Sequence, residues 1–183
     1  MTNIRTGIIF GTDTGNTEDI AHRMADQLQQ YNITAEVYNI TEADPETFSN
    51  YDLLILGIPT WDFGGIQADW DDMEEILPQL DLSRPVVALY GLGDQFGYGD
   101  YFVDAMGWLH NHLQLSGARF AGYWPTTGYE FDASLATLAD GKQFCGLAID
   151  EDQQFDLTDD RVGRWISQVM SEYRQLADVV EAG

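Results

Sequence analysis

Residues 8–18 read Ile8-Ile9-Phe10-Gly11-Thr12-Asp13-Thr14-Gly15-Asn16-Thr17-Glu18. The short apolar run at the start is typical of a buried strand, and the polar turn that follows it leads into a helical pattern. The first turn of a helix has unpaired backbone N–H groups and the positive end of the helix dipole. This order of elements therefore predicts a phosphate site at the start of the first helix.

The charge of this turn limits the kind of phosphate that it can hold. No lysine or arginine lies between Thr12 and Glu18, whereas a Walker-type loop needs a lysine and a dinucleotide loop needs the pattern GxGxxG. Asp13 and Glu18 add negative charge where a triphosphate would lie. We therefore favour a single phosphate monoester bound by uncharged donors. The turn alone leaves open an ordinary strand-to-helix connection with a good N-cap.

Composition limits the class of protein. A chain of 183 residues with 44% hydrophobic content predicts a single domain, 1–183, around one core. The one cysteine, Cys145, lies in an apolar run, which predicts a buried, inert thiol and a reducing compartment. The N-terminus does not resemble a signal peptide and no apolar run is long enough to cross a bilayer, so we expect a cytoplasmic protein without membrane insertion.

Net charge is the most extreme feature of the composition. Thirty-one acidic and eight basic residues give a formal charge of −23. This charge argues against nucleic acids and anionic membranes as partners and favours basic protein surfaces. Solubility, or adaptation to a salty interior, explains the same charge. The acids are spread along the chain, so a disordered acidic tail is not expected.

Apolar residues recur along the chain with the spacings of alternating strands and helices. Runs typical of strands lie at residues 8–10, 34–40, 53–57, 86–90, 120–123 and 144–149. Helical spacing predicts helices over about 16–31, 102–113 and 159–176. Strands that are apolar throughout are covered on both faces, so the alternation predicts an α/β fold with a parallel sheet and helices on both sides.

Ligands of such folds bind at the carboxyl ends of the strands. The third strand is followed by Pro59-Thr60-Trp61-Asp62-Phe63-Gly64-Gly65, and the fourth by Gly91-Leu92-Gly93-Asp94-Gln95-Phe96-Gly97-Tyr98-Gly99-Asp100. Trp61 and Tyr98, facing one another beside a phosphate site, suit a flat polycyclic ligand joined to a phosphate by a short tether. Either aromatic residue alone is explained as well by a cap on the sheet.

These motifs, together with Gly122-Tyr123-Trp124-Pro125 and Gly128-Tyr129, closely resemble those of the long-chain flavodoxins nearly end to end. The resemblance implies a doubly wound, five-stranded parallel sheet in the order 2-1-3-4-5, with the fifth strand interrupted by an insertion at about 124–143. It also implies a low-potential one-electron carrier that cycles FMN between semiquinone and hydroquinone and has no substrate-converting site of its own.

The resemblance assigns roles to residues of all three turns. Those implied to hold the phosphate are Thr12, Asp13, Thr14, Gly15, Asn16 and Thr17. Trp61 and Tyr98 would flank the isoalloxazine, and the turn that carries Trp61 also contributes Pro59, Thr60, Phe63 and Gly64. Backbone groups at Leu92, Gly93, Asp94 and Tyr101 would meet its pyrimidine edge, and the peptide after Asp62 its N5.

Three positions depart from the family pattern. Asp62 stands where the family commonly has asparagine, Gly65 replaces a usual glutamate, and Tyr101 replaces a usual asparagine. The first change puts in doubt the ease with which the peptide turns, and the last removes any side-chain contact expected there. No catalytic or metal-binding residue is implied.

An acidic segment at residues 69–75 favours partner proteins with basic surfaces. One helix near the site is expected to carry Asp69, Asp71, Asp72, Glu74 and Glu75. Like charges there would lower the potential of the reduced flavin and would steer the protein toward basic redox partners. The resemblance implies partners of the ferredoxin–NADP reductase, photosystem I, nitrogenase or pyruvate oxidoreductase class, and a monomeric carrier.

Two other functions remain open from the sequence. A flavodoxin-like quinone reductase would use NAD(P)H directly, but no motif offers a site for a pyridine nucleotide. A receiver-like signalling module would need a lysine beside an acidic pocket, and the only lysine is Lys142, far from the first three strand ends.

Overall fold

The centre of the computed structural model is a sheet of strands that are buried on both faces. The structure describes residues 3–181, so the ends of the expected 1–183 domain, residues 1–2 and 182–183, lie outside the described residues. The three central strands are β1 (Thr6–Phe10), β3 (Leu53–Trp61) and β5 (Val86–Leu92). Their apolar side chains form the core, as the continuous apolar runs in the sequence predict.

The sheet is parallel along its main path, with the order β2-β1-β3-β5-β6. Strand β2 (Glu36–Asn39) forms one edge. At the other edge, β6 (Arg119–Ala121) pairs with residues 86–88 of β5, and β9 (Leu147–Ile149) pairs with residues 90–92. Two short strands therefore fill the place of the fifth strand, which confirms the predicted order 2-1-3-4-5 and the predicted interruption.

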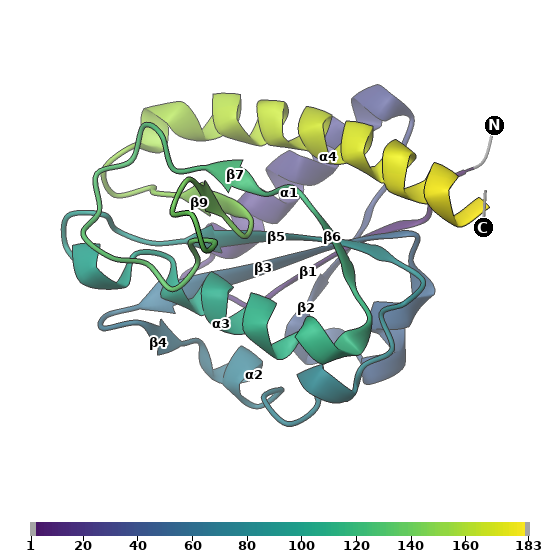
Figure 1. Cartoon of the computed structure of the whole chain (residues 1–183), viewed down its shortest axis with the longest axis horizontal. Coiled ribbons are helices and arrows are strands. Elements are labelled where there is room, and N and C mark those ends of the chain that lie inside the picture. Colours follow the sequence, from purple (N-terminus) through teal and green to yellow (C-terminus); the bar gives the residue numbers. More distant parts are fainter. Residues whose placement is uncertain (1–2, 182–183) are drawn as a thin grey trace.

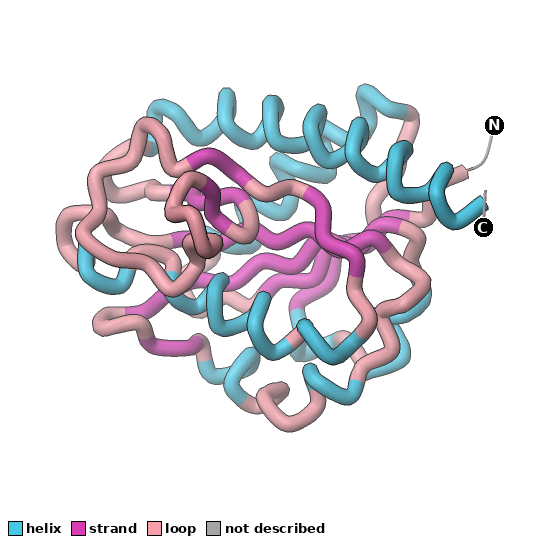
Figure 2. The backbone as a smooth tube through the Cα atoms, viewed as in Figure 1, coloured by secondary structure: helices cyan, strands magenta, loops and turns pink. Residues whose placement is uncertain are grey.

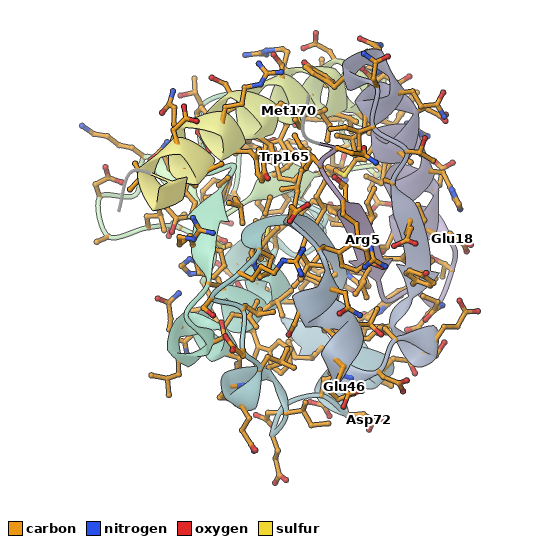
Figure 3. The ribbon with its side chains drawn as sticks, turned by 90° about the vertical axis from the view of Figure 1, so that its right-hand side faces the viewer. Arg5, Glu18, Glu46, Asp72, Trp165 and Met170 are labelled. Atoms are coloured by element: carbon orange, nitrogen blue, oxygen red, sulfur yellow. The ribbon has the colours of Figure 1, made fainter. Side chains whose placement is uncertain are left out.

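Helices cover both faces of the sheet, with α1 (Asn16–Leu28) and α4 (Thr158–Glu181) on one side and α2 (Ala68–Asp71) and α3 (Asp104–His112) on the other (Figure 1). Figure 2 shows the strands between these two layers. In Figure 3, Trp165 and Met170 lie on the side of α4 that faces the sheet, and both are buried. The amphipathic spacing in the sequence thus predicts both the helices and the faces that they bury.

Short elements complete the chain. The 3₁₀ helices are η1 (Gln29–Tyr31), η2 (Ile40–Glu42), η3 (Pro45–Asn50), η4 (Leu77–Gln79), η5 (Gly99–Tyr101), η6 (Gln114–Ser116) and η7 (Phe155–Leu157). Strand β4 (Gly65–Ile66) folds back antiparallel on the end of β3. Strands β7 (Trp124–Pro125) and β8 (Gln143–Phe144) pair antiparallel within the segment that interrupts the fifth strand.

The sequence predicts one strand at residues 144–149, but the structure divides this run between two strands, β8 and β9. Phe144 belongs to the β7–β8 hairpin, whereas Leu147–Ile149 joins the sheet as β9. Gly146 lies between the two pieces, and a side chain at this position would overlap the carbonyl group of Leu89. The chain therefore passes from the hairpin into the sheet at a residue without a side chain, where the backbone of β5 approaches closely.

The expected helix across residues 69–75 is also wrong. Helix α2 ends at Asp71 and is followed by tight turns, in which the N–H groups of Met73 and Glu74 donate to the carbonyl oxygens of Trp70 and Asp71. Like charges four residues apart, such as Asp71 and Glu75, destabilise a helix. The acidic residues of this segment are therefore presented on turns.

Substitution of Gly57 tests how closely β3 and β5 pack. A methyl group at this position of β3 would overlap the ring of the buried Tyr90 on β5. We expect Gly57→Ala to lower the free energy of unfolding by about 1–3 kcal/mol or more, because the core has no room to relax. Gly163→Ala on α4 is the matched control: its nearest neighbour would be Gln27 at 3.6 Å, and alanine favours helices. Urea unfolding of the two variants measures the difference, and equal stabilities would contradict the packing.

Candidate functional site

A cavity of about 320 Å³ lies at the carboxyl ends of the strands. The turns after β1, β3 and β5 and the turn after β9 meet there. Its lining residues are Thr12, Asp13, Thr14, Asn16, Thr17, Pro59, Thr60, Trp61, Asp62, Leu92, Gly93, Asp94, Tyr98, Tyr101, Glu151 and Asp152. The three segments that the sequence singles out therefore share one cavity.

The start of α1 supplies uncharged donors to this cavity. Gly15 precedes the helix in the left-handed conformation (φ 93°), which a residue without a side chain adopts at little cost. Thr12 Oγ1 accepts a hydrogen bond of 2.9 Å from the Gly15 N–H, and no side chain caps the helix. The N–H groups of the first turn are thus not used by a cap, and the threonine and asparagine side chains beside them line the cavity.

The turn after β3 contributes an aromatic wall. Trp61 lines the cavity, and its Nε1 is buried without a hydrogen-bond partner among the described residues. Asp62 follows in the left-handed region (φ 44°) and Gly64 likewise (φ 82°), so the chain turns sharply there. Tyr98 Oη donates a hydrogen bond of 3.1 Å to Asp62 Oδ1, which raises the pKa of Tyr98. This bond connects the turns that carry the two predicted aromatics.

Three of the predicted site residues do not line the cavity. Gly15 is the N-cap of α1. Phe63 is 76% exposed, and its ring centre lies 5.8 Å from the ring centres of both Tyr98 and Tyr101, in T-shaped arrangements. Gly64 lies against Asp104 and Tyr101. Phe63 and Gly64 therefore contact the residues that form the wall, and the binding roles expected for all three stay predictions.

Asp94 holds the turn after β5 in shape. Its Oδ1 accepts hydrogen bonds from the N–H groups of Phe96 (3.0 Å) and Gly97 (2.8 Å) and from Gln153 Nε2 (3.0 Å). Partial burial raises the pKa of Asp94, but these hydrogen bonds outweigh the burial, so the pKa lies below its ordinary value. The carboxylate is thus ionised and fixes the turn that leads to Tyr98.

The segment that interrupts the fifth strand braces the same turn from outside. The N–H groups of Asp132 and Ala133 donate to the Gly99 carbonyl oxygen at 2.8 and 3.0 Å. The Leu135 N–H donates to Asp104 Oδ1 at 2.7 Å. The Glu130 N–H donates to Gln95 Oε1. Residues 130–135 therefore hold both ends of the turn that carries Tyr98 and Tyr101.

Two lining residues were not expected from the sequence. Glu151 and Asp152 follow β9, whereas the prediction rested on the ends of the first, third and fourth strands. Burial raises the pKa of Asp152, and the carboxylates of Asp94 and Asp150 add to the effect. The predicted run at 144–149 ends just before these residues, so the rule that strand ends form the site would have found them if it had been applied to this strand as well.

The charge around the cavity has one sign. The carboxylates that line it are Asp13, Asp62, Asp94, Glu151 and Asp152, and no arginine, lysine or histidine of the described chain lines it. The nearest cation to this set is Arg23, whose Nη1 lies 3.8 Å from Glu151 Oε1. The expected acids at 69–75 do not line the cavity, although Asp69 is linked to it through Gln67, which bonds both Asp69 and Asp13.

Other candidate sites receive no support. Among residues 3–181, no group of three or more histidine, cysteine or acidic residues could hold a metal ion, and no helix has the length and apolar character needed to cross a membrane. Cys145 is buried, which raises the pKa of its thiol to about 12. The thiol is therefore protonated and inert, as predicted. Lys142 does not line the cavity.

A family model described as flavodoxin matches residues 8–165. The chain belongs to the flavodoxin family. Flavodoxin 2 of Salmonella typhi is 48% identical over 166 residues, which cover 91% of this chain and 95% of the relative. Flavodoxin 1 of Salmonella typhimurium is 47% identical over 177 residues, which cover 97% of this chain and 98% of the relative. That relative matches this flavodoxin through the interrupting segment, in agreement with the long-chain type.

A solved structure supports the same assignment. The crystal structure of the Fusobacterium nucleatum flavodoxin bound to flavin mononucleotide has a TM-score of 0.84 and 30% sequence identity to this flavodoxin. The match covers 92% of this chain and 98% of that chain.

The pH dependence of stability tests the contact between Asp104 and the segment at residues 130–135. The residue is 5% exposed, and burial raises its pKa although the Leu135 N–H bonds its Oδ1. The unfolded chain thus loses this proton first, near the ordinary pKa of about 3.9, and the folded state loses stability as the pH rises from there through the raised pKa.

We expect Asp104→Asn, which keeps an oxygen acceptor without the charge, to be more stable than the wild type at neutral pH. The gain should be smallest near pH 4 and grow with rising pH. Asp104→Ala is the matched control and should be about 1–3 kcal/mol less stable than Asp104→Asn at every pH, because it leaves the Leu135 N–H without its partner. Urea unfolding across pH measures both, and a gain that does not vary with pH would contradict the buried charge.

Proposed function

We propose that this flavodoxin carries single electrons at low potential between redox proteins, with FMN bound noncovalently in the cavity of about 320 Å³. Its relatives are flavodoxins over nearly their whole length, and the Fusobacterium nucleatum flavodoxin of the same fold binds flavin mononucleotide. When bound, FMN supplies the capacity to accept and release one electron at a time.

The residues of the cavity fit this cofactor. The buried Nε1 of Trp61 has no partner among the described residues, which is costly unless a ligand or water accepts its hydrogen bond. The first turn of α1 and the side chains of Thr12, Thr14, Asn16 and Thr17 offer a phosphate only uncharged donors. Such a set suits one monoester held at a helix N-terminus.

The division of roles follows from this arrangement. The first turn of α1 and the residues before it would hold the phosphate, whereas Trp61 and Tyr98 would flank the flat ring system. Tyr98 is fixed by Asp62, and the turn that carries it is fixed by Asp94 and by the brace at 130–135. The walls are therefore set in position by bonds within the protein, which lowers the entropic cost of binding.

The chemistry of the lining favours electron transfer over substrate conversion. No histidine, lysine or cysteine of the described chain lines the cavity, which therefore lacks the usual activated nucleophiles. The five carboxylates that line it would disfavour a reduced flavin that carries a negative charge, which would lower its reduction potential. We infer that the protein has no catalytic site of its own and works as a cytoplasmic monomer.

The same charge defines the kind of partner. A chain of net charge −23 with carboxylates at the mouth of its site attracts basic protein surfaces. Partners of the ferredoxin–NADP reductase, photosystem I, nitrogenase or pyruvate oxidoreductase class fit this requirement. Association with such a partner should slow as salt screens the attraction.

Purified protein tests the function directly. We expect a yellow protein that takes up one FMN per chain and passes electrons to a basic redox partner without consuming NADPH in the presence of a quinone. Material that is colourless and stays so after incubation with excess FMN would overturn the proposal. Rapid NADPH oxidation with quinones would instead identify an enzyme.

Trp61→Ala tests the aromatic wall. We expect the dissociation constant for FMN to rise roughly tenfold or more, because a ring stack and its buried apolar area are lost. Trp108→Ala is the matched control: Trp108 lies on α3 against His112, with ring centres 4.4 Å apart, and does not line the cavity. Fluorescence titration measures both affinities. Equal losses in the two variants would show that Trp61 acts only through stability.

The carboxylates at the cavity give a second test. We expect Asp62→Asn with Asp152→Asn to raise the potential of the more negative one-electron step by something on the order of tens of millivolts. The asparagine that replaces Asp62 can still accept the hydrogen bond from Tyr98. Asp71→Asn with Asp72→Asn removes the same charge from outside the cavity lining and should shift the potential less. Spectroscopic redox titration compares them, and equal shifts would assign the effect to net charge alone.

A further inference from the structure

A second cavity, also of about 320 Å³, lies where the interrupting segment meets the start of α4. It shares no lining residue with the first cavity. Its lining residues are Trp124, Pro125, Thr127, Gly128, Leu157, Asp160, Arg161 and Arg164. Two of the eight basic residues of a strongly acidic chain are therefore gathered at one cavity.

Arg161 is a buried cation whose hydrogen bonds go to uncharged acceptors. The residue is 7% exposed, and its guanidinium lies 4.1 Å from the centre of the Tyr129 ring. Its Nη1 donates to Gln154 Oε1 at 2.7 Å and its Nη2 to the Gly128 carbonyl oxygen at 3.4 Å. Within residues 3–181, no carboxylate is within ion-pair distance of this guanidinium. Buried charges are normally paired, whereas this guanidinium makes no direct ion pair within the described residues.

Arg164 adds a second guanidinium to the same wall. It lies one turn further along α4, over the ring of Trp124 at 5.5 Å, and its Nη1 is 3.4 Å from Asp160 Oδ2. Both residues of this ion pair are exposed, so the pair contributes little and leaves Arg164 able to contact a ligand. The remaining wall is apolar, from Trp124, Pro125 and Leu157, with the Thr127 hydroxyl as a further donor.

We propose that this second cavity binds a small monocarboxylate that carries a flat apolar group. The guanidinium of Arg161 has further N–H groups beyond the two that donate to Gln154 and Gly128, and these can donate to a carboxylate, while Arg164 adds to the attraction. The indole of Trp124 and the side chains of Pro125 and Leu157 cover an aromatic ring. Asp160 on the lining disfavours a second negative charge, which selects a monoanion over a phosphate dianion. The volume is within the range of small-molecule sites.

The experiment uses the FMN-loaded protein, so that the first cavity is filled. Benzoate, its uncharged analogue benzamide and inorganic phosphate are titrated separately, and the indole N–H resonance of Trp124 reports binding in NMR spectra. This N–H donates to Tyr129 Oη at 3.0 Å, so it lies beside the proposed site. We expect benzoate to bind roughly tenfold or more tightly than benzamide, as charge-assisted hydrogen bonds require.

Two arginine variants separate the site from a general effect of charge. Arg164→Gln should weaken benzoate binding several-fold without altering the fold, because its side chain is exposed. Arg84→Gln is the matched control: Arg84 is also exposed, pairs with Asp52 at 3.2 Å and does not line the cavity. Its affinity for benzoate should equal that of the wild type.

Several outcomes would overturn the proposal. Equal affinities for benzoate and benzamide would show an apolar hollow without anion recognition. Phosphate binding as tight as benzoate would refute selection for a monocarboxylate. Equal losses in Arg164→Gln and Arg84→Gln, or no change at Trp124, would leave Arg161 as a clamp between α4 and the interrupting segment. None of these results depends on electron transfer, so they leave the proposed function untouched.

Discussion

One row of the sheet positions the whole site. Phe10, Gly57 and Tyr90 are paired side by side across β1, β3 and β5. The Gly57 carbonyl oxygen accepts hydrogen bonds from the Gly11 N–H at 3.1 Å and from Trp70 Nε1 at 3.0 Å, and Tyr90 Oη donates to the Thr17 carbonyl oxygen at 2.9 Å. The turn after β1, the segment after β3 and the first helix are thus joined at one level, which fixes where the cavity forms.

Charged and uncharged groups are distributed differently in the two cavities. The end of the first cavity at the start of α1 offers hydroxyls, an amide and backbone N–H groups, whereas five carboxylates and no basic residue of the described chain line the cavity. A lysine at that end would attract a phosphate more strongly, but it would also offset the negative field of the carboxylates. The second cavity reverses this arrangement, with two guanidiniums gathered against aromatic rings.

Most of the fold follows from patterns that are local in the sequence. Wholly apolar strands, amphipathic helices and glycine-rich turns predict the parallel α/β sheet and bring most of the expected site residues to one cavity, whereas the order of the strands follows from the resemblance to the long-chain flavodoxins. What sequence patterns miss depends on contacts between distant segments. Gly146 divides an apolar run where the backbone of β5 approaches it. Helix α2 ends at Asp71, and the like charges of Asp71 and Glu75 would disfavour its continuation.

The brace at 130–135 acts largely through main-chain amides: those of Glu130, Asp132, Ala133 and Leu135 are its donors. Every amino acid except proline carries this group, so most replacements within the segment preserve these donors. The amino-acid sequence of this segment can therefore vary while its main chain still holds the turn that carries Tyr98 and Tyr101. Alanine scanning would leave these main-chain donors in place and would test only side chains such as Ser134, whose hydroxyl donates to the Phe102 carbonyl oxygen, whereas substitution by proline would remove the donors.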